Sequence, residues 1–348
     1  MLKLPGNLTA KQFLARHWQK KPLFMPAATG ALRPSVTRNE LAWLATLDDV
    51  ESRIVFTDRD EGRIRYRVET GPFASETLQS LPARDWSLLV HDVEKHLPAM
   101  REVFRLVPFI PDWRIDDLMV SFAAPGGGVG PHRDNYDVFL CQGIGAREWR
   151  YSTADIIEDA AASSDLALLQ AFKGDECCQS REGDVLYLPP GVAHWGTAQR
   201  ACLTYSIGMR APPGYADAGL QLDEVRPGYI SAAALRRAGD QGATFGCAVT
   251  ELKEWLQPVA PNERDVENFL RASPAGRALR LHGMTRIAYD DAHLYVNGAA
   301  RQLEASQRES IALLCARRRL SSSQAAPLDA QCLRWLLAVG ALEIPETR

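Results

Sequence analysis

The amino-acid sequence predicts an α+β protein organised around an antiparallel β-barrel or sandwich. Short apolar stretches with strand periodicity crowd into residues 116–209, and turns that contain glycine or proline separate them. Helical patterns precede this region and follow it. We therefore expect a β-rich core with helices before it and further helical units towards the C-terminus.

The composition is that of an ordinary globular protein. The chain has 348 residues, 46% apolar and 24% charged, which allows two or three domains. A net charge of -3 creates no basic field, so we do not expect direct nucleic-acid binding as its main role. Seven cysteines without a CxxC pair indicate reduced thiols and a cytoplasmic protein. No segment resembles a signal peptide or a membrane span.

Several elements are expected before the β-rich region. Thr9–Lys20 has the pattern of a capped helix, and a second helix is expected near Arg38–Leu47. Residues 53–70 alternate like the two strands of a hairpin. Apolar residues at helical spacing predict a third helix over Trp86–Val107.

Strands are expected from Asp116 onwards. Side chains of the first strand alternate between two faces, and Asp117, Met119 and Ser121 share one of them. A glycine-rich loop at 125–131 fits neither a Walker loop nor a dinucleotide fingerprint, because no helix follows it. Further strands are predicted at 137–142, 147–152, 184–188 and 201–209.

The pattern changes after residue 212. Residues 213–275 contain helical stretches, such as Ile230–Ala238 and Val249–Leu256, joined by charged connectors. From 276 onwards, strands that turn at Asn297-Gly298 precede two helices, at 305–319 and 330–339. We expect three parts, with boundaries 1–212, 213–275 and 276–348.

Three residues form a candidate metal site. His132 and Asp134 are two positions apart, so an extended chain turns both to one side, and His194 follows a Pro-Pro-Gly turn much later. Two imidazoles and one carboxylate can bind one face of an octahedral Fe(II) and leave positions open for a co-substrate and O₂. The spacing therefore predicts a non-haem Fe(II) oxygenase.

Such an oxygenase needs a reductant, usually 2-oxoglutarate, whose distal carboxylate the protein must hold. Arg147 or Arg150 could bind it bidentately, but the two point to opposite faces of one strand, so only one can enter the barrel. The hydroxyls of Ser121 and Thr204 stand on candidate inward faces. They could complete the carboxylate's hydrogen bonds or bond to neighbouring strands.

Longer motifs surround these residues. They are His17-Trp-Gln-Lys-Lys-Pro22, Asp112-Trp-Arg-Ile-Asp-Asp117, Pro125-Gly-Gly-Gly-Val-Gly-Pro-His132, Asp137-Val-Phe-Leu140, Gln142-Gly-Ile-Gly-Ala-Arg147 and Tyr187-Leu-Pro-Pro-Gly191. The set resembles the JmjC-type bacterial ribosomal oxygenases, in particular the YcfD/RoxA-like branch, which hydroxylates an arginine of a large-subunit ribosomal protein. The resemblance covers most of residues 10–212; beyond them it rests on domain order alone.

The resemblance implies an architecture and a set of roles. The core would be a double-stranded β-helix (the cupin/JmjC-type jelly roll), followed by a helical dimerisation segment and a winged-helix-like C-terminal domain, in a homodimer. His132, Asp134 and His194 match iron ligands. Arg147, rather than Arg150, matches the residue that holds 2-oxoglutarate, and Ser121 and Thr204 match positions that line its site.

The resemblance also implies a substrate pocket. Asp117, Met119 and Tyr136 match positions near the substrate side chain. A carboxylate that accepts from a guanidinium, with an aromatic face beside it, would suit an arginine.

Two other functions stay open. A ribosomal oxygenase of the same architecture could hydroxylate a histidine, which would not require Asp117. A cupin-like metal-binding regulator without turnover could instead bind nucleic acid through its C-terminal domain, which contains Arg317-Arg318-Arg319. Arg147 argues against the regulator, because a sensor has no need to hold 2-oxoglutarate.

Overall fold

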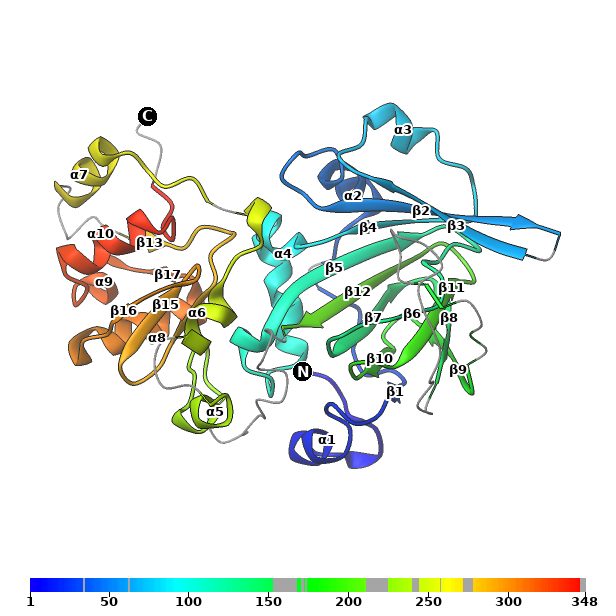
Figure 1. Ribbon diagram of the computed structural model, residues 1–348, viewed down its shortest axis with the longest axis horizontal. Helices are drawn as coiled ribbons and strands as arrows, with labels where there is room; N and C mark the ends of the chain where they lie inside the picture. The colour runs from blue at the N-terminus through cyan, green and yellow to red at the C-terminus, as the bar shows by residue number, and fades with distance from the viewer. Residues whose placement is uncertain are drawn as a thin grey trace. The chain divides into compact units, whose positions relative to one another are not determined.

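The computed structural model divides the chain into two compact units (Figure 1). It describes every residue except 34, 62, 153–167, 170–171, 173, 211–224, 240–243, 257, 272–277 and 345–348. The first unit contains residues 1–108 and 116–209, and the second contains 109–115 and 210–348. None of the described helices is long and apolar enough to cross a membrane.

Two antiparallel sheets form the first unit. The larger sheet has the strand order β1 (Leu23–Met25), β10 (Val185–Leu188), β7 (Val138–Ile144), β12 (Cys202–Met209), β5 (Ile115–Ala123), β4 (Trp86–Val90), β2 (Ser52–Asp60) and β3 (Arg63–Thr70). The smaller sheet has the order β6 (His132–Arg133), β11 (Ala193–Ala198), β8 (Ala146–Tyr151) and β9 (Glu176–Arg181). From β5 to β12 the chain passes repeatedly between the two sheets, as in a jelly roll. The predicted β-rich core is confirmed.

The inner faces of the two sheets share an apolar core. Val138, Leu140, Leu186 and Leu188 come from the larger sheet, and they cluster with Trp149 and Tyr151 of β8. Ala123 of β5 packs against Ala198 of β11 and Cys202. These contacts define which side chains point inwards, because residues two apart on a strand share a face.

Short helices accompany the sheets of the first unit. They are α1 (Ala10–Arg16), α2 (Arg38–Leu44), α3 (Ser75–Gln79) and α4 (Val93–His96), with a 3₁₀ segment at Pro98–Leu106. Thr9 and Thr37 begin α1 and α2, each with a reciprocal capping box. Both predicted helices start where expected and end a few residues early.

The helix predicted over Trp86–Val107 is wrong for its first part, whereas Val93–His96 (α4) and the 3₁₀ segment Pro98–Leu106 are helical. Residues Trp86–Val90 form β4, which pairs with β2 on one side and β5 on the other. Asp92 then adopts a left-handed conformation with φ 56°, and Pro98 begins the 3₁₀ segment. The apolar residues fall at helical spacing because a buried strand, a short α-helix and a 3₁₀ segment each bury their own side chains.

The second unit contains short helices and two small sheets. Its elements are α5 (Ala232–Arg237), α6 (Thr244–Thr250), α7 (Glu263–Arg271), β13 (Leu279–Arg280), β14 (Ile287–Tyr289), β15 (His293–Val296), β16 (Ala299–Gln302), α8 (Arg308–Arg317), β17 (Arg319–Leu320), α9 (Ser322–Ala325) and α10 (Ala330–Ala338). Asn297 and Gly298, with φ of 51° and 84°, form the expected turn between β15 and β16. The helix expected over Val249–Leu256 is instead the end of α6 followed by a 3₁₀ turn at Glu254–Leu256.

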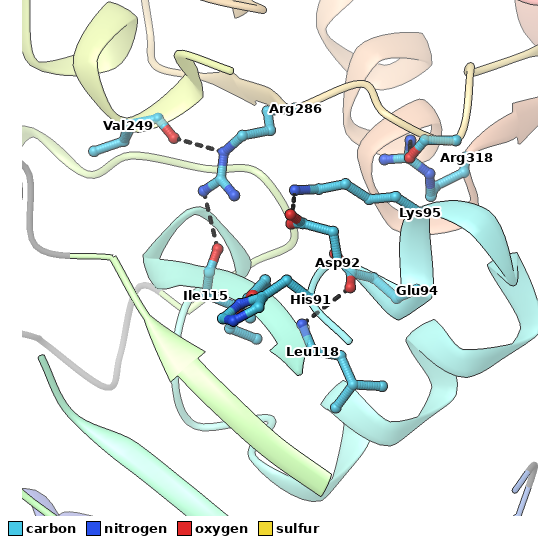
Figure 2. A network of polar contacts seen from close by, with 11 residues as sticks. His91, Asp92, Glu94, Lys95, Ile115, Leu118, Val249, Arg286 and Arg318 are labelled. Carbon is cyan, nitrogen blue, oxygen red and sulfur yellow. Dashed lines mark hydrogen bonds and ion pairs between the residues drawn. The ribbon is translucent and has the colours of Figure 1, made fainter. Parts of the chain in front are cut away.

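Residues 109–115 lie in the core of the second unit although residues of the first unit flank them in the sequence. The Trp113 ring meets Phe245 edge-on at 5.5 Å between centroids, and its Nε1 donates to the Tyr229 carbonyl at 3.0 Å. Arg286 donates to the carbonyls of Ile115, at 2.9 Å, and Val249, at 3.1 Å (Figure 2). This inserted segment is therefore part of that unit's packing.

Candidate active site

His132, Asp134 and His194 converge on one point of the first unit. His132 of β6 lies directly opposite His194 of β11 in the smaller sheet. Asp134 follows β6, and its two carboxylate oxygens lie 3.9 Å from His132 Nε2 and 3.6 Å from His194 Nε2. One ligand atom from each residue falls within 4.8 Å of the other two. This spacing suits three ligands of a single metal ion.

Backbone carbonyls orient both imidazoles. His132 Nδ1 lies 2.9 Å from the Gly130 carbonyl, and His194 Nδ1 lies 2.9 Å from the Val192 carbonyl. A carbonyl can only accept, so each Nδ1 carries the proton and each Nε2 offers its lone pair. Burial, and then the neighbouring His132, lowers the pKa of His194 to about 4, against a smaller opposing effect of Asp134. The donor set is two neutral imidazoles and a carboxylate.

Gly130 occupies a position that no other residue fits well. Its φ is 82°, and a Cβ there would lie 2.8 Å from both the Tyr66 ring and Leu168. Tyr66 belongs to β3 of the N-terminal hairpin. The close contact fixes the peptide whose carbonyl orients His132, which explains the glycine that precedes Pro131 in the loop.

Arg147 lies inside the barrel and Arg150 lies outside it. Arg147 is opposite Ala198 in the smaller sheet and so shares the inward face of His194, whereas Arg150 is opposite Trp195 on the outer face. Arg147 is 5% exposed, yet its Nε and Nη2 have no hydrogen-bond partner among the described residues. A buried guanidinium fork with unpaired donors is suited to bind a carboxylate.

Two further donors share this inward face. Trp149 Nε1 and Ser180 Oγ are buried and, among the described residues, also lack a partner. Ser180 lies opposite Arg147 on β9. The sequence did not identify Ser180 as an inward-facing residue. Strand β9 begins with the polar run Glu176-Cys-Cys-Gln, so its side chains show no apolar alternation.

Ser121 and Thr204 lie on the larger sheet. Both are buried, and Ser121 shares the face of Ala123, which contacts Ala198 of the opposite sheet. The Thr204 hydroxyl donates to Gln142 Oε1 at 3.2 Å. The Ser121 hydroxyl thus points inwards. Thr204 already makes a hydrogen bond to a neighbouring strand, which is one of the two roles expected for it from the sequence.

Asp117 and Met119 share the face of Ser121 on β5, and Tyr136 follows Asp134 by two residues. Asp117 is buried, Met119 is half-buried and the Tyr136 side chain is partly exposed. A Cβ on Gly208 would lie 2.9 Å from Asp117 Oδ1 and 3.9 Å from the Tyr136 ring, so both residues flank Gly208. Burial, and then the nearby Asp134 carboxylate, raises the pKa of Tyr136. These contacts bring a carboxylate and an aromatic ring together beside the metal ligands.

A buried polar cluster lies beside strand β5 (Figure 2). Glu94 Oε2 accepts from the Leu118 N–H at 3.0 Å, and Lys95 pairs with Asp92. Burial raises the pKa of Glu94 to about 7, against the attraction of Lys95. His91 Nδ1 lies 3.1 Å from Asp117 Oδ2. The sequence does not single out His91, because it shows no spacing to other histidines or acids that is typical of a ligand.

Arg318 has a structural role in the second unit. Its Nη2 donates to the carbonyls of His282, at 2.7 Å, and Thr285, at 3.0 Å. Only Arg317 and Arg319 of the arginine triplet therefore remain for a surface interaction, which weakens the argument for a nucleic-acid site.

Comparison with known proteins agrees with this geometry. Residues 102–216 match the protein family described as the JmjC domain. The ribosomal protein uL16 3-hydroxylase of Escherichia coli is 40% identical over 221 residues, which are 62% of this chain and 58% of that protein. A probable ribosomal oxygenase of Haemophilus influenzae is 36% identical over 217 residues, 60% of this chain and 51% of that protein.

Solved structures extend the likeness beyond the JmjC domain. The E. coli ribosomal oxygenase YcfD, in complex with cobalt and 2-oxoglutarate, is 29% identical, with a TM-score of 0.74 and coverage of 99% of both chains. Another X-ray structure of E. coli YcfD gives a TM-score of 0.76 at 29% identity, over 98% of this chain and 99% of that one. In sequence, by contrast, the chain matches little more than half the length of its curated relatives. The resemblance to JmjC-type ribosomal oxygenases inferred from the motifs is confirmed.

Proposed function

We propose that this protein is an Fe(II)- and 2-oxoglutarate-dependent oxygenase that hydroxylates an arginine side chain of a large-subunit ribosomal protein. The observation that carries the proposal is the convergence of His132, Asp134 and His194 on the face that also contains the unpaired guanidinium of Arg147. The cobalt and 2-oxoglutarate of the YcfD complex, and the uL16 named for the E. coli relative, support it.

The three ligands fit iron. Two neutral imidazoles and a carboxylate are the donors of the facial triad of non-haem Fe(II) oxygenases. Bound there, Fe(II) supplies the activation of O₂, with oxidative decarboxylation of 2-oxoglutarate to succinate and CO₂ as the source of electrons. The Gly130 and Val192 carbonyls would keep both imidazoles in the ligating orientation.

Arg147 would bind the distal carboxylate of 2-oxoglutarate. A planar guanidinium matches a carboxylate with two parallel hydrogen bonds, and a buried site strengthens both. Ser121 would add a hydroxyl from the opposite sheet. Thr204 would line the same site, with its own proton directed to Gln142.

Asp117, Met119 and Tyr136 would bind the substrate side chain. Asp117 offers a carboxylate to a guanidinium, Tyr136 offers an aromatic face and Met119 packs against the aliphatic part. The protein's task is then to hold one carbon of the arginine beside the metal and to exclude water.

Assembly and location complete the proposal. Residues 213–275 would form a helical dimerisation segment of a homodimer, and residues 276–348 a winged-helix-like domain. The protein would act in the cytoplasm, where it meets ribosomal proteins, and would bind no nucleic acid directly. Sedimentation velocity of the purified protein tests the dimer.

Mass spectrometry tests the activity. Large-subunit ribosomal proteins would be incubated with the purified protein, Fe(II), 2-oxoglutarate and O₂. We expect one added oxygen atom on an arginine with wild-type protein and with Asp58→Ala, an exposed aspartate of β2, but none with Asp134→Ala. The same gain on a histidine would support the proposed type of reaction but contradict the proposal that the substrate is an arginine. No gain on any protein, with 2-oxoglutarate unconsumed, would favour the metal-binding regulator.

A further inference from the structure

His91 contacts Asp117, the residue whose carboxylate is proposed to bind the substrate guanidinium. It follows β4, and its Nδ1 lies 3.1 Å from Asp117 Oδ2. The His91 side chain is 20% exposed and the Asp117 side chain 11%, so little water reaches the contact. A hydrogen bond to a carboxylate in such surroundings is stronger than one at the surface.

The two oxygens of Asp117 have different environments. Oδ2 faces His91, whereas Oδ1 faces Gly208, beside which the Tyr136 ring lies. His91 therefore binds Oδ2, while Oδ1 is directed towards Gly208 and the Tyr136 ring. With one oxygen held, the plane of the carboxylate has a restricted orientation.

Other buried acids lie close to this contact. Asp92 and Glu94 are both 1% exposed and lie on the same segment as His91 (Figure 2). Lys95 pairs with Asp92, and Glu94 accepts from a backbone N–H of β5. The His91 ring N–H therefore donates to Asp117 in an acidic environment.

We propose that His91 is a positioning residue that fixes the Asp117 carboxylate and so sets the preference of the pocket for arginine over lysine. The inference rests on the proposed function, since it needs an arginine substrate. A guanidinium binds a carboxylate through a planar fork and depends on the orientation of that carboxylate. An ammonium is a compact charge with rotatable donors, and it tolerates a carboxylate that turns. Loss of His91 should therefore weaken arginine binding more than lysine binding.

Two substitutions of His91 distinguish the loss of its hydrogen-bond donor from a change in the volume of its side chain. His91→Leu removes the donor and keeps an apolar side chain of moderate size. His91→Asn keeps an N–H donor near the position of Nδ1. His293→Leu is the matched control, because His293 contacts Asp290 in the second unit, with 3.5 Å between Nδ1 and Oδ1.

The probes are uL16 peptides, each with one arginine, and their counterparts with lysine in its place. Wild-type protein first selects the peptide that it hydroxylates. Binding of that arginine peptide and its lysine counterpart is then measured with Mn(II) and 2-oxoglutarate present. Consumption of 2-oxoglutarate without peptide, under Fe(II), reports whether the metal site is intact.

For His91→Leu we expect arginine binding to weaken about tenfold, the scale of one lost hydrogen bond to a charged group, and lysine binding to change less. Peptide-independent consumption of 2-oxoglutarate should stay at the wild-type rate. His91→Asn should recover most of the arginine preference, and His293→Leu should retain all of it.

Three results would overturn the inference, and they differ from failure of the proposed function. Equal loss for both peptides, or no loss, would show that His91 has no part in specificity. So would a His91→Asn variant as defective as His91→Leu. If wild-type protein consumes 2-oxoglutarate but modifies no arginine, the proposed substrate is wrong and the role of His91 falls with it.

Discussion

Arg147 and Arg150 lie three positions apart on β8 and serve as a matched pair. Arg147 is buried on the inward face, and Arg150 is exposed and pairs with Glu148. If Arg147 binds 2-oxoglutarate, Arg147→Ala should raise its KM about a hundredfold, since a charge-assisted pair in a buried site contributes up to about 3 kcal/mol. Arg150→Ala should leave the KM unchanged. Initial rates at varied 2-oxoglutarate measure both.

Arg147→Lys makes this prediction sharper. Lysine keeps the positive charge but lacks the planar pair of N–H donors of a guanidinium. The KM of Arg147→Lys for 2-oxoglutarate should therefore lie between those of wild type and Arg147→Ala. Equal KM values for all three would remove Arg147 from the 2-oxoglutarate site.

Glu94 predicts a pH dependence of stability. Its pKa is raised from 4.5 to about 7, because burial disfavours the charged carboxylate. The unfolded chain releases this proton at lower pH than the folded one. The contribution of Glu94 to stability is therefore fully present below the unfolded pKa and is lost as the pH rises to about 7.

Glu94→Gln should remove that loss. Its side chain can still accept from the Leu118 N–H, but it carries no titrating proton. Thermal melts at about pH 5 and about pH 7.5 should show a smaller decrease for the variant than for wild type. Glu40→Gln is the control, because its hydrogen bond with Thr37 lowers the pKa of Glu40, which puts that titration below this range. Parallel curves for wild type and Glu94→Gln would contradict the prediction.

Much of the candidate site could be predicted at the level of residues. The His-x-Asp spacing and the Pro-Pro-Gly turn before His194 identified three side chains whose ligand atoms do converge. Period 2 correctly put Arg147 and Arg150 on opposite faces, although the choice between them came from resemblance. His91 was not found, since its contact with Asp117 depends on the pairing of β4 with β5, and β4 was predicted as part of a helix.

At the scale of elements, β4 shows where sequence periodicity fails. Strand β4 is central in the larger sheet and buried on both faces, so Trp86-Ser-Leu-Leu-Val has no clear alternation. A short apolar run of this kind reads equally well as strand or helix. Read as a strand, it would have put Leu89 opposite Ser121 and His91 near Asp117. The strands of β7, β8, β10 and β12 were predicted because glycine or proline turns separate them.

The loop that leads to β6 provides a prediction about an element. Gly130→Ala would put a Cβ 2.8 Å from the Tyr66 ring at a φ of 82°, so the peptide must shift. The shift would move the carbonyl that orients His132 and weaken metal binding. Titration with Mn(II) should show a lower affinity, together with a loss of stability on the order of 1 kcal/mol from backbone strain.

Gly6→Ala is the control for Gly130→Ala. Gly6 also has a positive φ, of 59°, but a Cβ there would meet no atom within 4 Å, and Gly6 lies in a 3₁₀ turn near the N-terminus. It should lose similar stability and keep its metal affinity. Equal metal affinities for the two variants would mean that the Gly130 carbonyl does not matter.

At the scale of the whole molecule, Trp113 tests the division into units. It is 4% exposed and packs in the core of the second unit. Trp113→Ala should destabilise that unit by roughly 3–5 kcal/mol, as for other large buried side chains. Hydrogen exchange followed by mass spectrometry should show faster exchange in peptides of α5, α6 and β14–β15. Trp43→Ala, which removes a 52% exposed ring, should change little.

The division into units was only partly visible in the sequence. The change of composition after residue 212 lies close to the end of the first unit at Met209. The assignment of residues 109–115 to the second unit was not foreseen, because Trp113 precedes a strand of the first unit and nothing in its neighbourhood points elsewhere. Separate domains at 213–275 and 276–348 stay a prediction.

The inserted segment also constrains how this gene could be rearranged. A cut after Met209 would leave residues 210–348 without the Trp113 ring and without the Trp113 and Ile115 carbonyls that Arg286 binds. Recombination at that point would produce a C-terminal half with a cavity in its core, and an N-terminal half in which Trp113 lacks the apolar residues that it packs against. Exchange of the C-terminal unit between relatives should therefore succeed only when residues 109–115 travel with it, which ties the inheritance of the two units together.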